Sequence, residues 1–174
     1  MCIRDRFDGP VRSKNGFINI GPGMTKSLSA DTVLTVQEHA GRILLLNDAD
    51  GKFTLPAINV NADSAVAGPG SDPNNLNNIG ASFYFYIETA ATDLDIKTDG
   101  TDKFTGAVML AVDDGAKKAF VPAAANDVMT FDGGTAGGLA GSVVQVTAVD
   151  ENNYLVHNSL VIATGTIVTP FANA

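Results

Sequence analysis

The sequence predicts an all-β protein, a single-domain two-sheet β-sandwich of jelly-roll-like type with an extended N-terminal arm. Apolar runs of strand length recur along the chain, and each ends at a polar turn such as Asp-Gly, Asn-Gly or Gly-Gly. No long stretch has helical periodicity, and about nine to eleven strands are expected, which is enough for two packed sheets. No period of about 20 to 50 residues repeats, which argues against a solenoid.

The first part of the chain is expected to lie outside the body of the domain. Residues 1–6, MCIRDR, resemble a peptide that recurs at the start of reading frames from assembled environmental sequence, so we expect a non-native leader there. Residues 7–31 are rich in Gly, Pro and Ser and are expected to form the arm. Asn15-Gly16 precedes the alternating segment Phe17–Ile20, a pattern typical of a hairpin. Such an arm either packs on the body or reaches a neighbouring subunit.

The body is expected to span residues 32–174. Leu34 and Val36 are expected to share one face of its first strand. The next run, Ile43–Leu46, is apolar on both faces, which is typical of a central strand covered on both sides. The third strand is expected to end at Pro56, because proline cannot donate to a ladder of hydrogen bonds.

Residues 57–80 are the longest weakly structured piece of the chain, and their second half is dense in Asn, Gly and Pro. Loops of this length are uncommon inside a compact domain and are usually functional or disordered. We therefore expect a contact-making loop. Its candidates for an interface are Asn74, Asn75, Leu76, Asn77 and Asn78.

The clearest strand is Ser82–Glu88, in which phenylalanines alternate with tyrosines. The phenylalanine face is expected to belong to the core. Tyr84 and Tyr86, on the other face, are apolar in body and polar at the tip, which favours a half-buried surface or an interface. Three apolar residues of the arm complete the interface candidates: Phe17, Ile18 and Ile20.

The rest of the chain continues with short strands. Asp132–Gly141 is expected to be a flexible glycine-rich connection. After it, Gln145 and Thr147 are expected to face outward, because they alternate with valines. The remaining expected strands are Leu94–Ile96, Phe104–Val112, Ala119–Pro122, Val128–Phe131, Val144–Val146, Tyr154–Val156, Leu160–Ile162 and Ile167–Phe171.

Composition and charge exclude several classes of function. With 174 residues and 45% apolar residues, one domain with its own core is expected. The net charge of −8 disfavours nucleic-acid binding, because phosphate neutralisation needs clustered Lys and Arg. A single cysteine, Cys2, excludes a disulfide framework. Neither a transmembrane run nor an apolar leader is visible, so no membrane partner is expected. The chain is expected to fold in a reducing compartment.

We expect no catalytic residue. His39 is expected in a turn and His157 on a strand face, and neither accompanies a nucleophile-elbow motif. The nineteen acids offer many pairs, but sequence alone does not place two of them at the separation that a glycosidase needs.

No metal or cofactor site is expected either. Asp48–Gly51 resembles the start of a calcium loop, but it lacks the third ligand and the distal Glu, so a hairpin turn is the better interpretation. The glycine-rich connection lacks the Lys-Ser/Thr of a phosphate loop. With no Trp and three Tyr, an aromatic platform for sugars is poorly supplied.

The string TVQEHAGRILLLNDADGKFTLPA, with GASFYFYIE, DGTDKFTGAV and GSVVQVTAVDENNYLVHNSLVIATG after it, resembles structural proteins of tailed bacteriophages, especially marine ones. The resemblance covers roughly residues 32–165 in patches, and its motifs are turn and strand markers. The matching residues are Thr35, Glu38, Ala40, Gly41, Arg42, Leu44, Thr54, Leu55, Pro56, Gly80 and Phe85.

The resemblance implies a non-enzymatic virion component, and we expect a capsid decoration (cement) protein. Such a protein is made in the host cytoplasm, binds the major capsid protein on the outer capsid surface, and stabilises the shell by bridging capsomers. A homotrimer is expected, because closed cyclic symmetry is expected for such an oligomer and threefold contact points are common on icosahedral shells.

Three alternatives stay open. The first is a tail-fibre or receptor-binding β module that recognises a host surface glycan. The second is an enzyme, most plausibly a glycan hydrolase. The third is a secreted adhesin.

Overall fold

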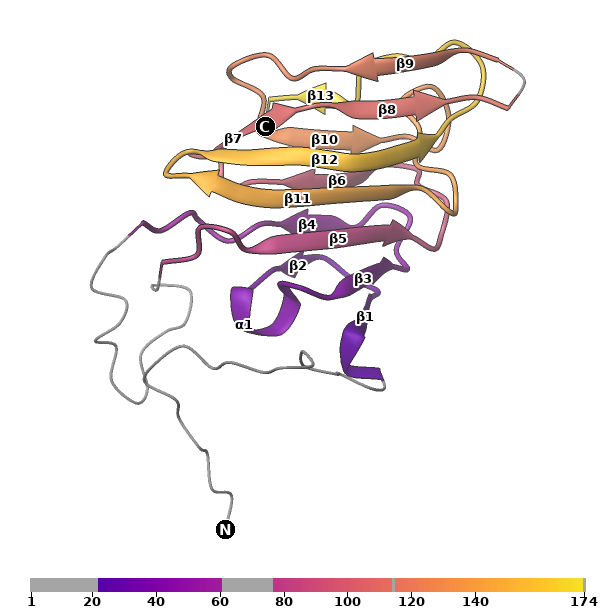
Figure 1. Cartoon of the computed structure of the whole chain (residues 1–174). Coiled ribbons are helices and arrows are strands. Elements are labelled where there is room, and N and C mark those ends of the chain that lie inside the picture. Colours follow the sequence, from indigo (N-terminus) through magenta and orange to yellow (C-terminus); the bar gives the residue numbers. More distant parts are fainter. Residues whose placement is uncertain (1–21, 61–76, 114, 174) are drawn as a thin grey trace, which may run out of the picture.

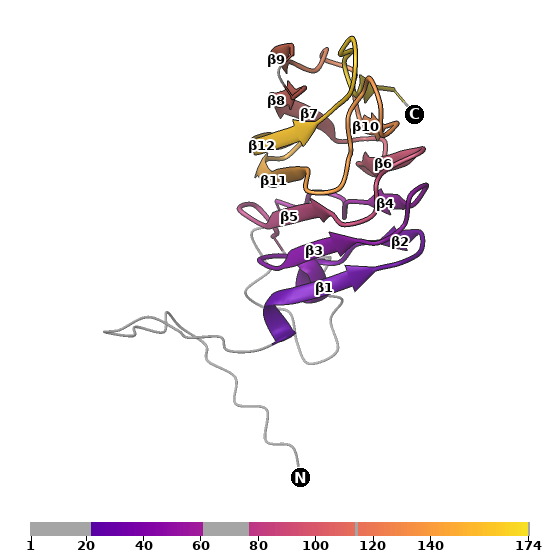
Figure 2. The ribbon, with the colours of Figure 1, turned by 90° about the vertical axis from the view of Figure 1, so that its right-hand side faces the viewer.

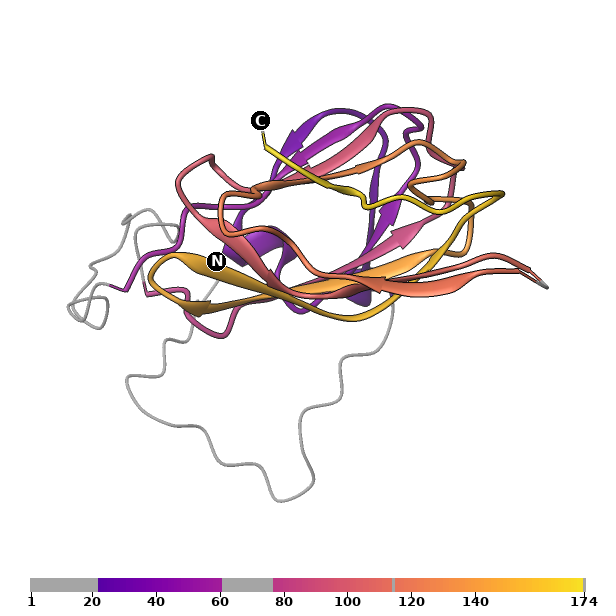
Figure 3. The same cartoon turned by 90° about the horizontal axis from the view of Figure 1, so that it is seen from above.

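The computed structural model describes residues 22–60, 77–113 and 115–173, and the regular secondary structure of this part of the chain is almost all β, in two packed sheets. The expected all-β, two-sheet sandwich is therefore confirmed. Figures 1 and 2 show the sheets as two layers, with successive strands stacked from the lower end of the molecule to the upper end. Figure 3, seen from above, shows that the hairpin formed by strands β8 and β9 extends past the second layer.

The larger sheet has eight strands, in the order β1-β3-β5-β11-β12-β8-β9, with β7 pairing β12 beside β8. We call it the large sheet. Its strands are β1 (Thr25–Leu28), β3 (Ile43–Leu46), β5 (Ser82–Ile87), β7 (Lys103–Gly106), β8 (Val108–Ala111), β9 (Lys117–Phe120), β11 (Val143–Asp150) and β12 (Asn153–Ile162).

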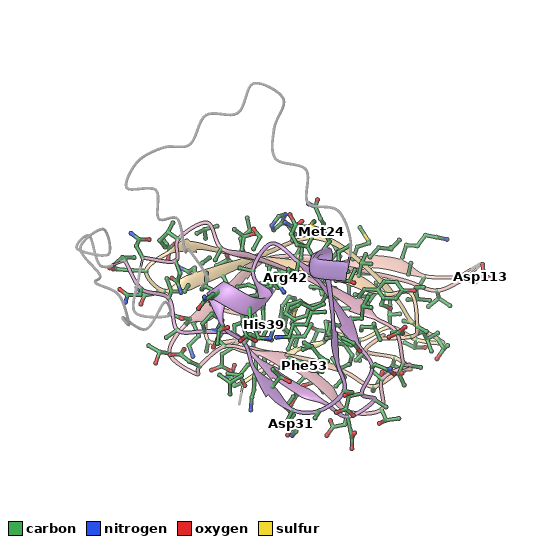
Figure 4. All side chains as sticks on the ribbon, turned by 90° about the horizontal axis from the view of Figure 1, so that it is seen from below. Met24, Asp31, His39, Arg42, Phe53 and Asp113 are labelled. Carbon is green, nitrogen blue, oxygen red and sulfur yellow. The ribbon has the colours of Figure 1, made fainter. Side chains whose placement is uncertain are left out.

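The small sheet has five strands, in the order β13-β10-β6-β4-β2. They are β2 (Thr32–Val33), β4 (Lys52–Thr54), β6 (Leu94–Lys97), β10 (Val128–Phe131) and β13 (Phe171–Ala172). A 3-10 turn, η1 (Pro22–Met24), precedes β1, and a one-turn helix, α1 (Val36–His39), lies across the lower end of the sandwich (Figure 4).

The first strands wind as a flattened coil rather than as a jelly roll. Strands β1 to β6 alternate between the two sheets, and each lies parallel to the strand two places before it. A jelly roll is an antiparallel architecture, so the jelly-roll part of the prediction is not confirmed. No repeat is visible in the sequence because the turns differ in length: one runs from Thr25 to its partner Ile43, and the next, from Ile43 to Tyr84, is more than twice as long.

The body begins earlier than the sequence predicts. Residues 25–28, assigned to the arm, form β1, which pairs in parallel with β3, and Leu28 is buried in the core. A strand with one buried side chain leaves little trace in an apolar pattern, which explains the error. Val36 also differs from the prediction, because it starts α1 instead of continuing a strand. The Thr35 hydroxyl oxygen accepts a hydrogen bond from the Glu38 amide (3.3 Å) and caps that helix.

The core follows the predicted alternation on most strands. In β5, the phenylalanines are buried and the tyrosines are exposed. The largest fully buried side chain is Tyr154, whose hydroxyl group donates a hydrogen bond to the Pro56 carbonyl oxygen (2.6 Å). The other large buried side chains are Phe53, Phe83, Phe85, Phe104, Phe131, Leu34, Leu44, Leu46, Leu55, Ile87 and Leu94.

The large sheet is bent where two irregularities face each other. Gly106 (φ +89°) separates β7 from β8, and Asn158 (φ +45°) interrupts the regular pairing of β12. The Ser159 hydroxyl group fills the gap, since it donates to the Ala107 carbonyl (3.1 Å) and accepts from the Met109 amide (3.2 Å). The expected single strand Phe104–Val112 is thus two strands, and two strands expected on either side of Asn158 are one.

The glycine-rich connection 132–141 is packed rather than flexible. The Asp132 carboxylate accepts hydrogen bonds from the Gly134 and Ala136 amides (2.8 Å each) and from the Thr135 hydroxyl group. Burial opposes ionisation of this group, but these hydrogen bonds outweigh burial and lower the pKa of Asp132. Gly133 has no room for a side chain, because a Cβ atom there lies 2.1 Å from the Ala91 carbonyl oxygen.

Candidate functional site

An exposed apolar row crosses the outer face of the large sheet from one edge to the other. Strand pairing places one residue of every strand except β7 in this row, which we call the outer row: Ser27, Leu45, Tyr86, Val143, Leu160, Met109 and Ala119. The accessible fractions are large for such residues, at 37% for Tyr86 and 51% for Leu160. Single exposed apolar residues are normal, but a contiguous set indicates an interaction surface.

A groove lies beside the outer row, over strands β3, β5, β11 and β12. Its volume is about 320 Å³ and its lining is mostly apolar: Ile43, Tyr84, Phe85, Tyr86, Val143, Val144, Gln145 and Asn158. The next row of the sheet supplies part of this lining, because Ile43 pairs with Tyr84 and Tyr84 with Gln145. The groove therefore follows from strand register.

The two rows carry no Asp, Glu, Lys or Arg. The second row consists of Thr25, Ile43, Tyr84, Gln145 and His157. The outer face of the small sheet differs, since Lys52, Asp95 and Thr130 are neighbours in one row there. The Asp95 carboxylate accepts from the Thr130 hydroxyl group (2.7 Å) and lies 3.7 Å from the Lys52 ammonium group. Charge is therefore absent from the two rows while the rest of the chain is strongly acidic.

One polar side chain in the groove has an unused donor. Gln145 is only 7% exposed, and its Oε1 accepts a hydrogen bond from Asn158 Nδ2 (2.8 Å). Among the described residues, its Nε2 has no acceptor, and the side chain lines the groove. A nearly buried amide donor that faces a cavity is available to an oxygen atom of a bound molecule.

A chain of polar side chains lies next to the groove. Ser82 Oγ is 2.7 Å from Thr147 Oγ1, which is 2.9 Å from His157 Nε2. Hydroxyl groups and an imidazole resemble parts of a catalytic triad, but such a triad also needs a carboxylate that orients the imidazole. The described contacts of His157 include none, so the arrangement is best explained as cross-strand bonding between β5, β11 and β12.

The two interface candidates at the end of loop 57–80, Asn77 and Asn78, differ in burial. Asn78 is buried (4% exposed), its Nδ2 donates to the Ala57 carbonyl (2.8 Å) and its Oδ1 accepts from the Asn59 amide (2.8 Å). The prediction of Asn78 as an interface residue is wrong, because its amide group ties the two stems together. Asn77 is exposed, but its Oδ1 accepts from the Ile79 amide (3.0 Å), which is a local turn contact.

A buried carboxylate holds the same stem. Asp102 accepts a hydrogen bond from the Ile58 amide (2.8 Å), and burial raises the pKa of Asp102. The remaining loop and arm candidates lie outside the described residues: Asn74, Asn75, Leu76, Phe17, Ile18 and Ile20. Of the interface candidates that the structure describes, Tyr84 and Tyr86 lie together at the groove, and Asn77 and Asn78 do not line it.

Sequence reasoning missed several residues of this face, among them Ile43, Val143, Leu160 and Met109. Val143 was within reach, because it has the same strand phase as the predicted outward residue Gln145. Met109 was also within reach, because the alternation of β7 continues into β8, where Val108 and Leu110 are buried. Leu160 was not, because the irregularity at Asn158 changes the phase of β12.

His39 is more buried than the sequence predicts. It is 3% exposed and lies at the lower end of the sandwich, where Figure 4 also labels Phe53. The Thr35 amide donates to Nδ1 (2.9 Å), which places the proton of the neutral ring on Nε2. Nε2 is buried and has no hydrogen-bond partner among the described residues, and burial lowers the pKa of His39.

The described residues contain no group of three or more His, Cys, Asp or Glu side chains arranged to share a metal ion. None of the helices in the described ranges has the length and apolar composition that a membrane crossing requires. The chain matches no protein-family model, no curated protein and no solved structure.

Proposed function

We propose that this protein is a non-enzymatic structural protein that acts by protein–protein contact, and that it serves as a capsid decoration protein of a tailed bacteriophage. The observation that carries the proposal is the pair of uncharged, tyrosine-containing rows on the outer face of the large sheet. Protein interfaces are depleted in charge at their centre and enriched in Tyr and Met. The phage assignment rests on the resemblance of the sequence to virion proteins.

The proposed mechanism is mechanical. Each copy lays the outer row on an apolar patch of the major capsid protein and bridges neighbouring capsomers. The contact stabilises the shell by mass action, because it forms only when both surfaces are folded. A stable contact of this kind buries more than about 1,000 Å² in total, so it extends beyond the groove along the outer row.

Charge supports the choice of face. The chain carries a net charge of −8, and an acidic partner surface opposed to clustered carboxylates is repelled. On the outer row a partner meets no carboxylate, and every strand of the large sheet except β7 contributes a neutral side chain.

Sedimentation with assembled shells of the corresponding major capsid protein tests the proposal. The wild-type protein is expected to co-sediment, and Leu160→Asp, which places a carboxylate on the outer row, is expected to reduce binding at least about tenfold. Thr54→Asp, on the outer face of the small sheet, is the matched control and is expected to bind normally. Equal binding of all three proteins, or binding of none, contradicts the proposal.

The second candidate function is a receptor-binding module for a surface glycan. The specific observation in its favour is that Tyr84 and Tyr86 lie beside the amide groups of Gln145 and Asn158, which supply polar contacts next to aromatic rings. Binding to a glycan array that is lost in Tyr84→Ala, with no binding to shells, favours this function over the first.

A further inference from the structure

We propose that the groove over β5 and β11 binds the segment Phe17–Ile20 of a neighbouring copy of this chain. The inference rests on the proposed function, in which the outer face of the large sheet is a contact surface, and it names the first partner of that surface. Bridging then begins with an exchange of arms between subunits.

The groove has the chemistry of a site for an extended peptide. Its lining is almost entirely apolar, and Tyr84 and Tyr86 are exposed beside it (40% and 37%). Gln145 also lines this space, and its Nε2 is a donor without an acceptor among the described residues. Apolar side chains fill such a lining, while one main-chain carbonyl oxygen accepts the hydrogen bond from the amide.

The segment Phe17–Ile20, with the sequence Phe-Ile-Asn-Ile, offers the complementary groups. It has three large apolar side chains and no charge, which suits a groove flanked by two uncharged rows. Its alternating pattern favours an extended backbone, and an extended backbone presents its carbonyl groups to the sides. One of them reaches the Gln145 amide while the apolar side chains enter the groove.

Charge also favours contact between the arm and the body of another copy. Residues 1–21 contain four of the eleven Lys and Arg residues but only two of the nineteen Asp and Glu residues. The basic excess remains when residues 1–6 are left out, since residues 7–21 contain two basic residues, Arg12 and Lys14, and one acidic residue, Asp8. An acidic body therefore attracts this arm at long range and guides the apolar segment to its site.

The short chain between Ile20 and Thr25 favours binding of the segment to a neighbouring copy over binding to its own subunit. The groove lies about 10 to 14 Å from β1, because it is two to three strand spacings away. The path from Ile20 to Thr25 contains the 3-10 turn η1, so it spans at most about 15 Å. Docking on the subunit's own groove therefore needs an almost straight path across the sheet. A neighbouring copy imposes no such limit, and a closed ring of three such exchanges gives a homotrimer.

Photocrosslinking on the full chain tests the proposal. Phe17 is replaced by the photoreactive residue benzoylphenylalanine, the protein is irradiated at micromolar concentration, and the adducts are mapped by peptide mass spectrometry. The expected adduct has twice the 18.0 kDa mass of the monomer and joins residue 17 to a peptide that contains Tyr84 and Tyr86. An adduct within one monomer, or an adduct to another surface, overturns the proposal.

Mass photometry and light scattering give an independent readout. Phe17→Ser combined with Ile18→Ser is expected to weaken self-association at least about tenfold, and Gln145→Ala is expected to weaken it to a smaller degree. Pro10→Ser combined with Val11→Ser changes two arm residues outside the segment and is the matched control, expected to associate normally. Thermal unfolding confirms that Gln145→Ala is folded, and unchanged association in that folded variant and in the double serine variant contradicts the proposal.

The failure of this inference is distinguishable from that of the proposed function. If the crosslink and the association tests fail while shell binding still depends on Leu160, the groove has another occupant and the decoration function stands. If Leu160→Asp binds shells normally, the proposed function itself fails.

Discussion

The outer faces of the two sheets differ in chemistry although they belong to one fold. On the small sheet, Lys52, Asp95 and Thr130 interact across strands, and the row satisfies its own charges and hydrogen bonds. On the large sheet, the outer row runs through exposed apolar side chains such as Leu160 and Met109 without a single charge. The outer face of the small sheet is therefore polar and suited to contact with water, whereas the large sheet exposes an apolar surface that a protein partner can cover.

The difference extends to the backbone. The large sheet contains two residues with positive φ within its strands or between them, Gly106 and Asn158, and the described strands of the small sheet contain none. The bend at these residues lets Met109 and Leu160 stand beside each other in the outer row. A binding surface on a sheet thus depends on backbone irregularities as well as on side-chain alternation.

The largest expected effect comes from breaking the bend that only the large sheet has. A Cβ atom at Gly106 lies 2.2 Å from the Val156 carbonyl oxygen, and φ is +89°. Gly106→Ala is therefore expected to lower the free energy of unfolding by about 3 kcal/mol. Urea unfolding followed by circular dichroism measures it, and Gly100→Ala, also at positive φ but with open space at Cβ, is the control with a smaller loss. Equal losses in both variants show that the bend is unimportant.

The next effect compares a charge placed on each face. Tyr86→Asp on the outer row is expected to reduce association with a protein partner, measured by co-sedimentation with capsid shells, at least about tenfold. The reason is that a carboxylate buried in the contact without a counter-charge is costly. Thr54→Asp on the small sheet is expected to leave association unchanged, because Lys97 is its cross-strand neighbour there. Both variants are expected to unfold within about 0.5 kcal/mol of the wild type, since both positions are partly or fully exposed. Identical association of the two variants removes the functional distinction between the faces.

A smaller effect concerns the pH dependence of stability, which we assign to His39 at the lower end of the sandwich. Burial lowers the pKa of His39 below its unfolded value of 6.5. The unfolded chain therefore binds the proton first. The stability due to the neutral ring is complete above pH 6.5 and is lost progressively as the pH falls from 6.5 toward the lower folded-state pKa. Lowering the pH from about 7.5 to about 5.5 is expected to lower Tm by about 2 to 4 °C.

Calorimetry of two variants identifies the group that causes the change of Tm with pH. His39→Gln is expected to flatten the change of Tm with pH, because the titrating ring is gone. His157→Gln, on the outer face of the large sheet, is expected to keep the slope of the wild type. A slope that survives in His39→Gln shows that another group governs acid stability.

The smallest effect is expected on the small sheet. Lys52→Met removes the ammonium group that lies 3.7 Å from the Asp95 carboxylate. The ammonium side is exposed, so thermal unfolding is expected to change the free energy by about 0.5 kcal/mol or less. A loss several times larger shows that this face depends on ion pairing, and the contrast with the large sheet then needs another explanation.

The fold class was predictable because strand alternation and turn residues act locally. In β5, alternation alone assigned the phenylalanines to the core and the tyrosines to the surface, and both assignments are confirmed. The order and direction of the strands were not predictable, since a parallel coil and an antiparallel sandwich use the same alternation. Turns of unequal length also removed the repeat that identifies a coil.

The candidate site was predictable only in part. Tyr84 and Tyr86 were found from their own strand, while Ile43 and Leu160 join them through register between strands that are distant in the chain. Asn78 shows the opposite error. A run of asparagines suggested an exposed contact loop, but the hydrogen-bonding capacity of Asn78 is used inside the protein, at the loop stem.

The distribution of tyrosines has a practical consequence. The chain contains no Trp and three Tyr, so its near-ultraviolet emission is dominated by tyrosine. Tyr154 is sealed in the interior, whereas Tyr84 and Tyr86 stand at the groove. A molecule that covers the groove therefore perturbs two of the three fluorophores, and the protein reports its own occupancy without a label.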